Sequence, residues 1–537
     1  MTPIIRINRP GETVHEIEGV PGATLLECVS AAGVFLDAPC GGQGKCGKCL
    51  VRLAPDGEQV LACRTLVDGN MDVYLPDDFE MKIADKGAAV DLSLQKKAPL
   101  SANLGVAVDI GTTTVVAHST DVDTGARIAT ASGVNAQRAF GADVISRIQY
   151  CADNGHETLT RLIRGQLSSL IRKTCAASGA RAENIGYISI AANTIMEHLA
   201  AGYSPVGMGV VPFTPVSLFG EEMAAGDDLS VAKDAKIYFA PSISSYVGGD
   251  ITAGMLAAGL ENMQGPVIYL DIGTNGEIAM KIGEKYYCCA TAAGPAFEGA
   301  EITMGMAAVS GAINHLKWDN GLKLSVIGDS APRGLCGSGL LDALALLLDT
   351  GAVDESGRML DADEIEHEVA TYISEIDGKN VFWLAKPIYQ APCETSGEMC
   401  RGGDYPDAFD GVYMSASDIR KLQLAKSAIA AGIQTLLNHA GVTEEQVNSF
   451  VLAGGFGSFM DQYSAARIGL FPKSFLPVTQ TLGNTAGEGA ALALYSAKAR
   501  VALNNMRERC EYIELSTSSV FNEQFVEQMM FDDFSGT

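Results

Sequence analysis

The sequence predicts an α/β protein in which a small β-rich domain precedes a larger, duplicated α/β domain of two lobes. Two observations predict this architecture. Short alternating strand patterns and a cluster of four cysteines fill the first part of the chain. Further on, the motif Asp-Ile-Gly-Thr occurs twice, at Asp109–Thr112 and Asp271–Thr274, each time between two apolar strands. A repeat at this spacing is too wide for a solenoid and indicates an internal duplication.

The first domain is predicted over residues 1–80. Two alternating segments flank a Pro-Gly turn, which is typical of a hairpin, and a segment with helical spacing follows them. Three more short strands complete a small sheet wrapped on one helix. The predicted hairpin strands are Ile4–Asn8 and Val14–Glu18, the helix is Ala23–Ala32, and the later strands are Cys49–Leu53, Gln59–Leu61 and Met71–Leu75.

The rest of the chain divides by its periodicity. Residues 81–103 lose the strand pattern and are predicted to be a linker. Strands then alternate with long helical patterns over 104–262, the first lobe, and over 263–500, the second lobe. The C-terminal tail, 501–537, contains an acidic and aromatic segment that is typical of a docked terminal helix.

The composition restricts the class of protein. Of 537 residues, 47% are hydrophobic and 19% are charged, as expected for globular domains. The formal net charge is -26, and such an acidic field repels phosphate backbones and anionic lipids. The chain has no uncharged apolar run of about 18 residues, and its N-terminus does not resemble a signal peptide. We therefore expect a cytoplasmic protein that binds neither nucleic acid nor membranes.

Four of the 13 cysteines form a candidate metal site in the first domain. Cys40, Cys46 and Cys49 lie on one loop, and Cys63 follows alone. Glycines on the loop let backbone N–H groups approach the sulfur atoms, and two lysines offset negative charge. A structural zinc site also takes four thiolates, but it usually pairs two short Cys-x2-Cys units. The pattern favours a [2Fe–2S] cluster and leaves zinc as the alternative.

The two Asp-Ile-Gly-Thr motifs are candidate phosphate-binding turns. Each is followed by a strand, which excludes the Walker and Rossmann loops, because their glycines open a helix. A hairpin turn of this kind holds phosphate oxygens with backbone N–H groups and hydroxyls, while its aspartate faces a metal ion. Two such turns facing one another would clamp a polyphosphate and Mg²⁺ between the lobes. The candidate residues are Asp109, Gly111, Thr112, Thr113, Asp271, Gly273, Thr274 and Asn275.

Three further glycine-rich segments support this site. A buried strand from Ser449 enters a glycine turn at Gly454, Gly455 and Gly457, which is placed to lie against an adenosine. Helices rich in small residues are predicted at Gly248–Leu260 and Gly483–Ala490. Small residues let two helices cross closely, as a hinge between lobes requires.

This set of motifs resembles the acetate kinase/sugar kinase/Hsp70/actin superfamily, whose fold is a duplicated ribonuclease-H-like domain. Asp109–Thr114 is similar to its first phosphate motif, Asp271–Glu277 to its second and Ala453–Gly457 to its adenosine motif. The small-residue helices resemble its two connecting helices. The N-terminal domain resembles a [2Fe–2S] ferredoxin of β-grasp fold.

With a ferredoxin in front, the whole chain resembles the reductive activases of corrinoid-dependent methyltransferases. Three more segments carry this resemblance: Asn135–Arg147, Ala293–Gly299 and Gly334–Asp342. Longer members carry a separate middle domain, for which only the linker is available here. The resemblance implies an ATP-dependent one-electron reduction of a corrinoid protein, Co(II) to Co(I). It also implies an external low-potential electron donor and a homodimer.

Several residues receive roles in this interpretation. Asp109 and Asp271 would hold Mg²⁺ and order water, and the threonines would bind phosphates. Asp250 is the candidate that orients the attacking water, although it is also placed to cap a helix. Asn193 either reaches the γ-phosphate or caps its helix. Lys426 either reaches the nucleotide or is solvated.

Other functions remain open at this stage. The chain could be an ATP-coupled low-potential electron donor to another metalloenzyme, or a small-molecule kinase of the same superfamily. It could also be a redox-sensing module that uses ATP only as a conformational switch. A kinase does not explain the ferredoxin domain. Activators of 2-hydroxyacyl-CoA dehydratases also couple ATP to electron transfer, but their cluster lies between ATPase subunits.

Overall fold

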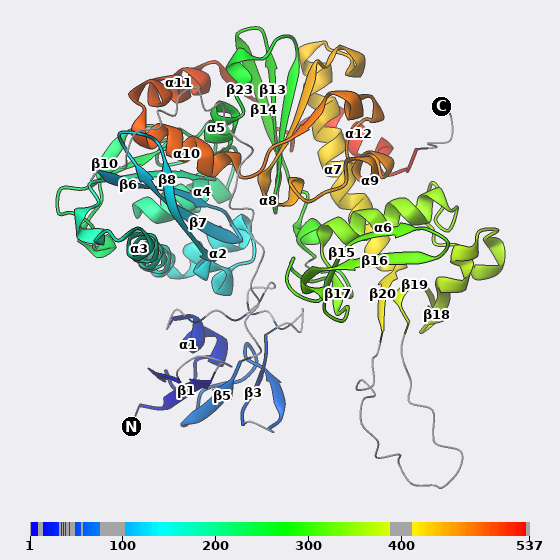
Figure 1. The fold of residues 1–537 in the computed structure, drawn as a ribbon, viewed down its shortest axis with the longest axis horizontal. Coiled ribbons are helices and arrows are strands. Elements are labelled where there is room, and N and C mark those ends of the chain that lie inside the picture. Colours follow the sequence, from blue (N-terminus) through cyan, green and yellow to red (C-terminus); the bar gives the residue numbers. More distant parts are fainter. Residues whose placement is uncertain are drawn as a thin grey trace.

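The computed structural model describes residues 2–8, 14–31, 34, 36, 38, 42, 44, 49–54, 57–75, 103–299, 301–386 and 411–532. These residues form an N-terminal domain, two lobes that are each built on a six-stranded sheet, and an extension of the second lobe with two three-stranded sheets (Figure 1). The predicted linker, 81–103, lies outside the described residues except for Asn103.

The N-terminal domain is a five-stranded mixed sheet with the strand order β2-β1-β5-β3-β4. Strand β1 pairs antiparallel with β2, as the predicted hairpin requires, and parallel with β5. Helix α1 covers one face, where Ile5, Leu25, Val29 and Val73 are fully buried. This arrangement confirms the predicted sheet on one helix. Its elements are β1 (Ile4–Asn8), β2 (His15–Glu18), α1 (Leu25–Ala31), β3 (Leu50–Arg52), β4 (Gln59–Leu61) and β5 (Met71–Tyr74).

Lobe I has the strand order β10-β11-β9-β6-β7-β8. Strands β6, β7 and β8 form an antiparallel meander, and β9 and then β11 join parallel to β6 on its other side. Val106, Val108 and Ile110 of β6 are fully buried. The strands are β6 (Leu104–Ile110), β7 (Thr114–Asp121), β8 (Arg127–Val134), β9 (Tyr187–Ala192), β10 (Glu222–Ala224) and β11 (Lys236–Phe239).

The helices of lobe I begin and end at recognisable signals. Asp143 caps α2 and accepts a 2.7 Å hydrogen bond from the Ser146 backbone. Helix α3 ends at Gly179, which adopts the left-handed conformation with a φ of 73°. The helices are α2 (Val144–Asn154), α3 (Glu157–Ser178), α4 (Thr194–Ala201) and α5 (Gly249–Ala257).

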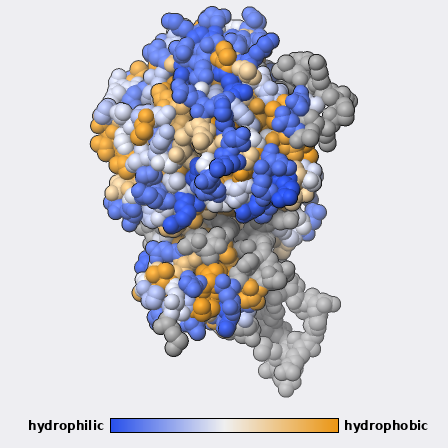
Figure 2. All heavy atoms as spheres, turned by 90° about the vertical axis from the view of Figure 1, so that its left-hand side faces the viewer, coloured by the Kyte–Doolittle hydropathy of each residue, from blue (hydrophilic) through white to orange (hydrophobic). Residues whose placement is uncertain are grey.

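One face of lobe I and of the N-terminal domain is seen in Figure 2. Hydrophilic side chains dominate this face, and apolar ones gather in separate patches. Among the described residues, no helix combines the length and the apolarity that crossing a bilayer requires. The face seen in Figure 2 presents mostly polar groups to water.

Lobe II repeats the sheet of lobe I. Its strand order is β22-β21-β12-β13-β14-β23. Strands β12, β13 and β14 form the meander, and β21 and then β22 join parallel to β12. The predicted duplication is thus confirmed for five strands of each sheet, whereas the sixth strand differs: β10 pairs with β11 in lobe I, and β23 pairs with β14 at the opposite edge in lobe II. The strands are β12 (Val267–Ile272), β13 (Gly276–Ile282), β14 (Lys285–Thr291), β21 (Ser449–Ala453), β22 (Thr479–Thr481) and β23 (Cys510–Tyr512).

Helices α5 and α10 (Thr485–Tyr495) cross between the lobes (Figure 1). A Cβ atom at Gly489 would collide with the Ala253 carbonyl group, and one at Gly254 would collide with the Tyr269 hydroxyl group. The contact of Gly489 with Ala253 confirms the predicted close crossing of the small-residue helices, whereas Gly254 lets α5 approach Tyr269 of β12. Helix α10 also packs on β6 and β9 of lobe I, although it follows the lobe II strands in the sequence.

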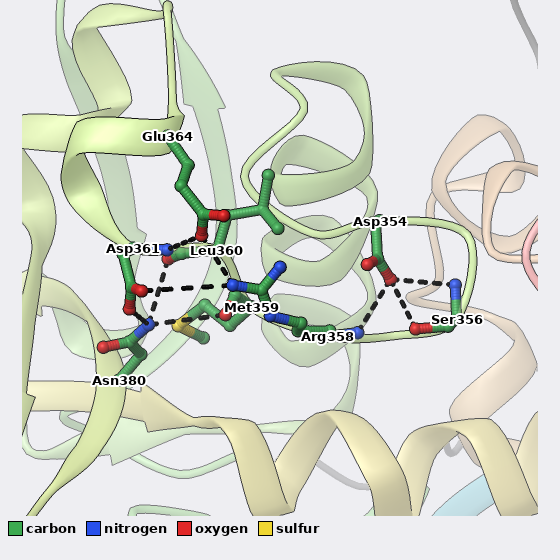
Figure 3. A network of polar contacts seen from close by, with 8 residues as sticks. All are labelled: Asp354, Ser356, Arg358, Met359, Leu360, Asp361, Glu364 and Asn380. Carbon is green, nitrogen blue, oxygen red and sulfur yellow. Dashed lines mark hydrogen bonds and ion pairs between the residues drawn. The ribbon is translucent and has the colours of Figure 1, made fainter.

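The extension of lobe II carries the sheets β16-β15-β17 and β18-β19-β20. A polar network holds the loop after α6 to β19 (Figure 3). Arg358 donates to Glu364 at 2.6 Å, and Asn380 donates to Asp361 at 2.7 Å. Exposed pairs of this kind contribute about 0–1 kcal/mol each, so they fix the loop without dominating stability. The elements are β15 (Ala312–Trp318), β16 (Leu322–Val326), β17 (Gly334–Leu335), α6 (Gly337–Asp349), β18 (Ile373–Ile376), β19 (Lys379–Ala385) and β20 (Val412–Ser415).

The C-terminal segment docks on lobe II. Helix α12 (Ser519–Glu527) packs on α7 (Ala416–Ala440), as Figure 1 shows. Beyond α12, the chain is held by side chains of α7, because Gln423 donates to the Met529 carbonyl at 2.9 Å and Ser427 to the Gln528 carbonyl at 2.8 Å. The predicted docked terminal helix is therefore present. The remaining helices are α8 (Gly454–Gly457), α9 (Gln462–Arg467) and α11 (Ala497–Glu508).

Candidate functional site

The first candidate turn joins β6 to β7 and is held rigidly by neighbouring elements. Asn135 donates from its side chain to the Gly111 carbonyl at 2.9 Å and from its backbone to the Thr113 carbonyl at 2.8 Å. Arg147 donates to the Thr112 carbonyl at 2.5 Å. The segment 135–147, which the sequence analysis quoted only for its resemblance, therefore fixes all three carbonyl groups of the turn.

The second candidate turn joins β12 to β13 and lies beside the glycine turn that follows β21. The Gly273 N–H donates to the Asn275 carbonyl at 2.9 Å. In the parallel pairing of β12 with β21, Asp271 lies opposite Ala453. Gly454 follows with a φ of 86°, and a Cβ atom there would collide with Asp271 Oδ1. The structure therefore brings the predicted second phosphate turn and the predicted adenosine turn together.

Four carboxyl groups at the site influence one another's ionisation. Burial raises the pKa of Asp109 to about 7, that of Asp271 to about 6 and that of Asp250 to about 8. The charges of Asp271 and Asp109 add to the rise at Asp250. Burial, followed by the charges of Asp250 and Asp271, also raises the pKa of Glu277. Negative charge is therefore costly at this place unless a cation compensates it.

These oxygen donors fit Mg²⁺ arriving with a nucleotide. Magnesium in nucleotide sites takes one or two carboxylates and completes its shell with phosphate oxygens and water. Within the described residues, no three Asp, Glu, His or Cys side chains converge enough to form a metal site by themselves.

Asn193 and Asp250 both bind the first turn of a helix, whereas their proposed contacts with phosphate and water remain predictions. Asn193 caps α4 by accepting a 3.0 Å hydrogen bond from the Met196 backbone, and its amide donates to Thr112 Oγ1 at 3.2 Å. Asp250 accepts a 2.8 Å hydrogen bond from the Ile251 backbone in the first turn of α5. Asn193 is therefore the N-cap of α4, whereas Asp250 lies within the first turn of α5, whose N-cap is Gly248.

Lys426 is the exception among the candidates. Its Nζ atom donates to the Met530 carbonyl at 2.6 Å and lies 5.0 Å from the centre of the Phe531 ring. Burial lowers its pKa to about 8. The structure therefore corrects the predicted nucleotide contact, because this lysine holds the C-terminal segment on α7.

Half of the candidate iron–sulfur site is described. Cys49 directly precedes β3 and Cys63 follows β4, and both side chains are buried. The Cys49 carbonyl accepts a 2.8 Å hydrogen bond from the Ala62 backbone, which brings the two segments together. A Cβ atom at Gly42 would lie 3.9 Å from the Cys63 Cβ atom, so the glycine-rich loop reaches the fourth cysteine. Cys40 and Cys46 lie outside the described residues.

Glu298 is a site residue that the sequence analysis did not assign. It follows β14 in the 3-10 helix Pro295–Glu298. Its carboxylate accepts hydrogen bonds from Thr113 of the first turn, at 2.9 and 3.1 Å, and from Thr274 of the second, at 2.7 Å. The segment 293–299 was quoted only for its resemblance, and nothing in its spacing predicts that it bridges the two turns.

Asn484 and Tyr269 also belong to the site without having been predicted there. Asn484 donates to Asp109 at 2.7 Å. The Tyr269 hydroxyl group lies 3.4 Å from Asp271 and 2.8 Å from the Thr485 hydroxyl group. The small residues around Asn484 predicted a helix crossing, but they did not indicate which side chain faces the site.

The fold and the site define a class of protein: a two-lobed nucleotide-binding domain of the actin, Hsp70 and sugar-kinase superfamily, fused to a ferredoxin-like domain. Comparison with family models agrees with this class. Residues 265–386 and 397–535 match the C-terminal, ASKHA domain of RACo, and residues 104–263 match the RACo middle region. Residues 9–68 match the 2Fe-2S iron-sulfur cluster binding domain, which favours iron–sulfur over zinc.

The chain belongs to the family of RACo-type corrinoid activators. It is 30% identical to the corrinoid activation enzyme RamQ of Eubacterium limosum, over 97% of this chain and 98% of RamQ. It is 24% identical to the methylated amine-specific corrinoid protein reductase of Methanosarcina barkeri, over 79% of this chain and 76% of the reductase. The solved structure of a reductive activator for a corrinoid, iron-sulfur protein aligns with a TM-score of 0.68 and 27% identity, over 98% of both chains.

The middle-region model of the family matches residues 104–263, which form lobe I, and leaves only the linker between the ferredoxin-like domain and the lobes. The C-terminal model extends to residue 535 and so includes most of the predicted tail, 501–537.

Proposed function

We propose that this chain uses ATP to drive the one-electron reduction of a corrinoid protein from Co(II) to Co(I). The observation that carries the proposal is the presence, in one chain, of paired phosphate turns and a 2Fe-2S-type domain. The end-to-end likeness to a corrinoid activation enzyme supports it. Neither half alone suggests this task, because the lobes suit any ATPase and the first domain suits any electron carrier.

The ATP half of the proposal rests on positioning and electrostatics. Thr112, Thr113 and Thr274 bind phosphate oxygens through their hydroxyl groups, together with the backbone of Gly111, Gly273 and Asn275. Asp109 and Asp271 hold Mg²⁺, whose charge compensates the crowded carboxyl groups. Asp250 orients the attacking water through its carboxyl group. Gly454, Gly455 and Gly457 lie against the adenosine.

Closure of the lobes would couple hydrolysis to electron transfer. Gly489 of α10 lies against the backbone of Ala253 in α5, and such close packing of small residues suits a hinge between the lobes. A nucleotide that shifts a two-state equilibrium by about 10⁴ supplies roughly 5.5 kcal/mol. At 59 mV for each tenfold change, this corresponds to about 240 mV for one electron. A shift of that size is sufficient to drive an otherwise unfavourable reduction.

The electron half of the proposal rests on the first domain. Cys40, Cys46, Cys49 and Cys63 would hold a [2Fe–2S] cluster, which supplies single electrons at low potential when bound. Burial of Cys49 and Cys63 and the approach of Gly42 provide the enclosed thiolate site that such a cluster needs. We further propose that an external low-potential donor supplies electrons to this cluster. We also propose that the chain forms a homodimer through the ATPase lobes.

The decisive experiment follows the corrinoid spectrum under anaerobic conditions. The reduced protein is mixed with a Co(II) corrinoid protein, with and without Mg·ATP, and the Asp271→Asn variant is run beside the wild type. We expect Co(I) only with ATP, and a loss of at least about a hundredfold in rate for the variant, because a charge-stabilising group is removed. Asp319→Asn, in an exposed turn, is the matched control and keeps the wild-type rate.

The other outcomes separate the alternatives. ATP hydrolysis without Co(I), in a protein with an intact cluster spectrum, would replace the corrinoid protein by another low-potential acceptor. Full activation by Asp271→Asn despite abolished hydrolysis would show that ATP acts only as a conformational switch.

A further inference from the structure

Glu298 occupies a place where the two phosphate turns meet. Thr113 belongs to lobe I and Thr274 to lobe II, and both hydroxyl groups donate to this one carboxylate at distances between 2.7 and 3.1 Å. The residue itself comes from neither turn, because it lies in the loop between β14 and β15. A single anionic group thus satisfies one donor from each lobe.

A buried cation, Arg147, attracts this carboxylate. Arg147 is fully buried behind the first turn. Its guanidinium group donates to the carbonyl groups of Gly141 and Thr112, to the side-chain amide of Gln137 and to the sulfur of Met196. Burial lowers the pKa of Arg147 to about 9, whereas attraction to Asp143 and Glu298 opposes that effect. Glu298 therefore serves as one of the distant counter-charges of a buried cation.

A bound terminal phosphate conflicts with this arrangement. Each threonine hydroxyl group has one proton to donate, so it cannot serve the carboxylate and a phosphate oxygen at the same time. Two anions at the same place also repel each other strongly in a partly buried site. Either the carboxylate leaves or the phosphate does not reach both turns.

The backbone beside Glu298 is fixed. Phe297 is buried and stacks on Phe456 of the glycine turn, with 5.4 Å between ring centres. A Cβ atom at Gly337 would collide with the Phe297 carbonyl group, so the loop is closely packed at this point. The carboxylate therefore moves by rotation of its own side chain rather than with the loop.

We propose that Glu298 occupies the terminal-phosphate position of the nucleotide-free protein and that ATP, but not ADP, must displace it. The inference rests on the proposed function of the two turns as phosphate sites. It makes Glu298 a residue that sets the preference between the two nucleotides. It lowers the affinity for ATP and leaves ADP, which lacks the terminal phosphate, nearly unaffected.

The test is calorimetric titration of the full chain with ADP and with a non-hydrolysable ATP analogue, both with Mg²⁺. Glu298→Gln removes the competing charge while it preserves size, and we expect about tenfold tighter binding of the ATP analogue. We expect less than a threefold change for ADP. Glu301→Gln, an exposed glutamate of the same loop, is the matched control and changes neither affinity. Glu298→Ala should tighten binding of the analogue in the same direction.

Each other result has a definite meaning. Equal or weaker binding of the ATP analogue by both Glu298 variants, at unchanged melting temperature, would overturn the inference and make the carboxylate part of the nucleotide site. A wild-type protein that binds neither nucleotide would overturn the proposed function together with the inference. Tighter binding of ADP and of the analogue by the same factor would show a general charge effect instead of competition for the terminal phosphate.

Discussion

Asn484 at the start of α10 donates a 2.7 Å hydrogen bond from its side-chain amide to Asp109 at the end of β6. The other atom of the same amide accepts a 2.7 Å hydrogen bond from the Gly487 backbone and so caps α10. One side chain therefore joins the crossing helix to the first phosphate turn. Any shift of α10 relative to lobe I changes the environment of Asp109.

This link predicts different results for two substitutions at one position. Asn484→Ala removes both the cap and the donor, and we expect it to destabilise the protein by about 1–2 kcal/mol at every pH. Asn484→Asp keeps a good capping residue but places a second carboxyl group against Asp109. We expect near-normal stability at pH 5.5 and a clear loss at pH 8, measured by thermal melting. Equal losses for both variants at both pH values would show that only the cap matters.

The crowded carboxyl groups predict an unusual pH dependence. Asp250, Asp109 and Asp271 have folded-state pKa values of about 8, 7 and 6, all above the unfolded value of 3.8. Between these limits the folded protein binds more protons than the unfolded chain, so their contribution to stability falls as the pH rises from about 4 to about 8. We expect the melting temperature of the nucleotide-free protein to fall between pH 5.5 and 8, and Mg·ATP to reduce the fall.

Asp250→Asn isolates part of this effect. The neutral amide cannot ionise, so we expect the nucleotide-free variant to exceed the wild type in stability at pH 8. We expect a gain of about 1 kcal/mol, well below the 1.36 kcal/mol per pKa unit of the full shift, because the Asp250 side chain is half-buried and water screens its charge. The same variant should lose ATP hydrolysis. Asp234→Asn, at an exposed position of lobe I, should show neither change. A variant that is less stable than the wild type at pH 8 would contradict the repulsion argument.

The contact between Gly454 and Asp271 predicts a steric loss of function. Gly454→Ala strains a backbone with a φ of 86° and places a methyl group against Asp271 Oδ1. We expect at least tenfold weaker ATP binding, measured by titration, because the carboxylate must move away from the second turn. Gly186→Ala meets no atom within 4 Å and serves as the control. Unchanged ATP affinity in Gly454→Ala would show that the position of Asp271 is not required for binding.

The first domain holds a fifth cysteine that serves as an internal control. Cys28 lies in α1 and its side chain is buried, as those of Cys49 and Cys63 are. We expect Cys63→Ser to abolish the visible absorption of a [2Fe–2S] cluster and to reduce iron to less than one atom per chain, whereas Cys28→Ser keeps both. Zinc in place of iron in the wild-type protein, found by metal analysis after anaerobic purification, would reject the cluster assignment.

The parts of the site that the sequence predicts are those encoded by local geometry. Each Asp-Ile-Gly-Thr motif lies between two strands that pair directly, so its turn is set by neighbours in the sequence. The crossing of α5 and α10 is predicted for a similar reason, because small residues such as Gly489 and Ala253 let the two helices approach closely. Five strands of each sheet follow the same order, so the duplication in the sequence carries over to this part of the fold.

The remaining parts depend on contacts that no local pattern encodes. Glu298 reaches the site because a loop after β14 returns between the lobes, and its partner Thr113 is 185 residues away. Lys426 was placed wrongly for the same reason. A lysine among apolar residues of a long helix indicates burial, but the sequence does not show that the C-terminal segment, about 100 residues later, supplies its partner.

The packing of α10 on β6 has a consequence for synthesis on the ribosome. Asn484 follows Asp109 by 375 residues, and Ala107 of β6 shares a buried cluster with Ala490 and Leu494 of α10. At about 5–20 residues per second, roughly 20–75 s pass between the emergence of the strand and that of the helix that covers it. Lobe I therefore exposes an apolar strip for most of translation, and the nascent chain depends on protection there until about the last tenth of it is made.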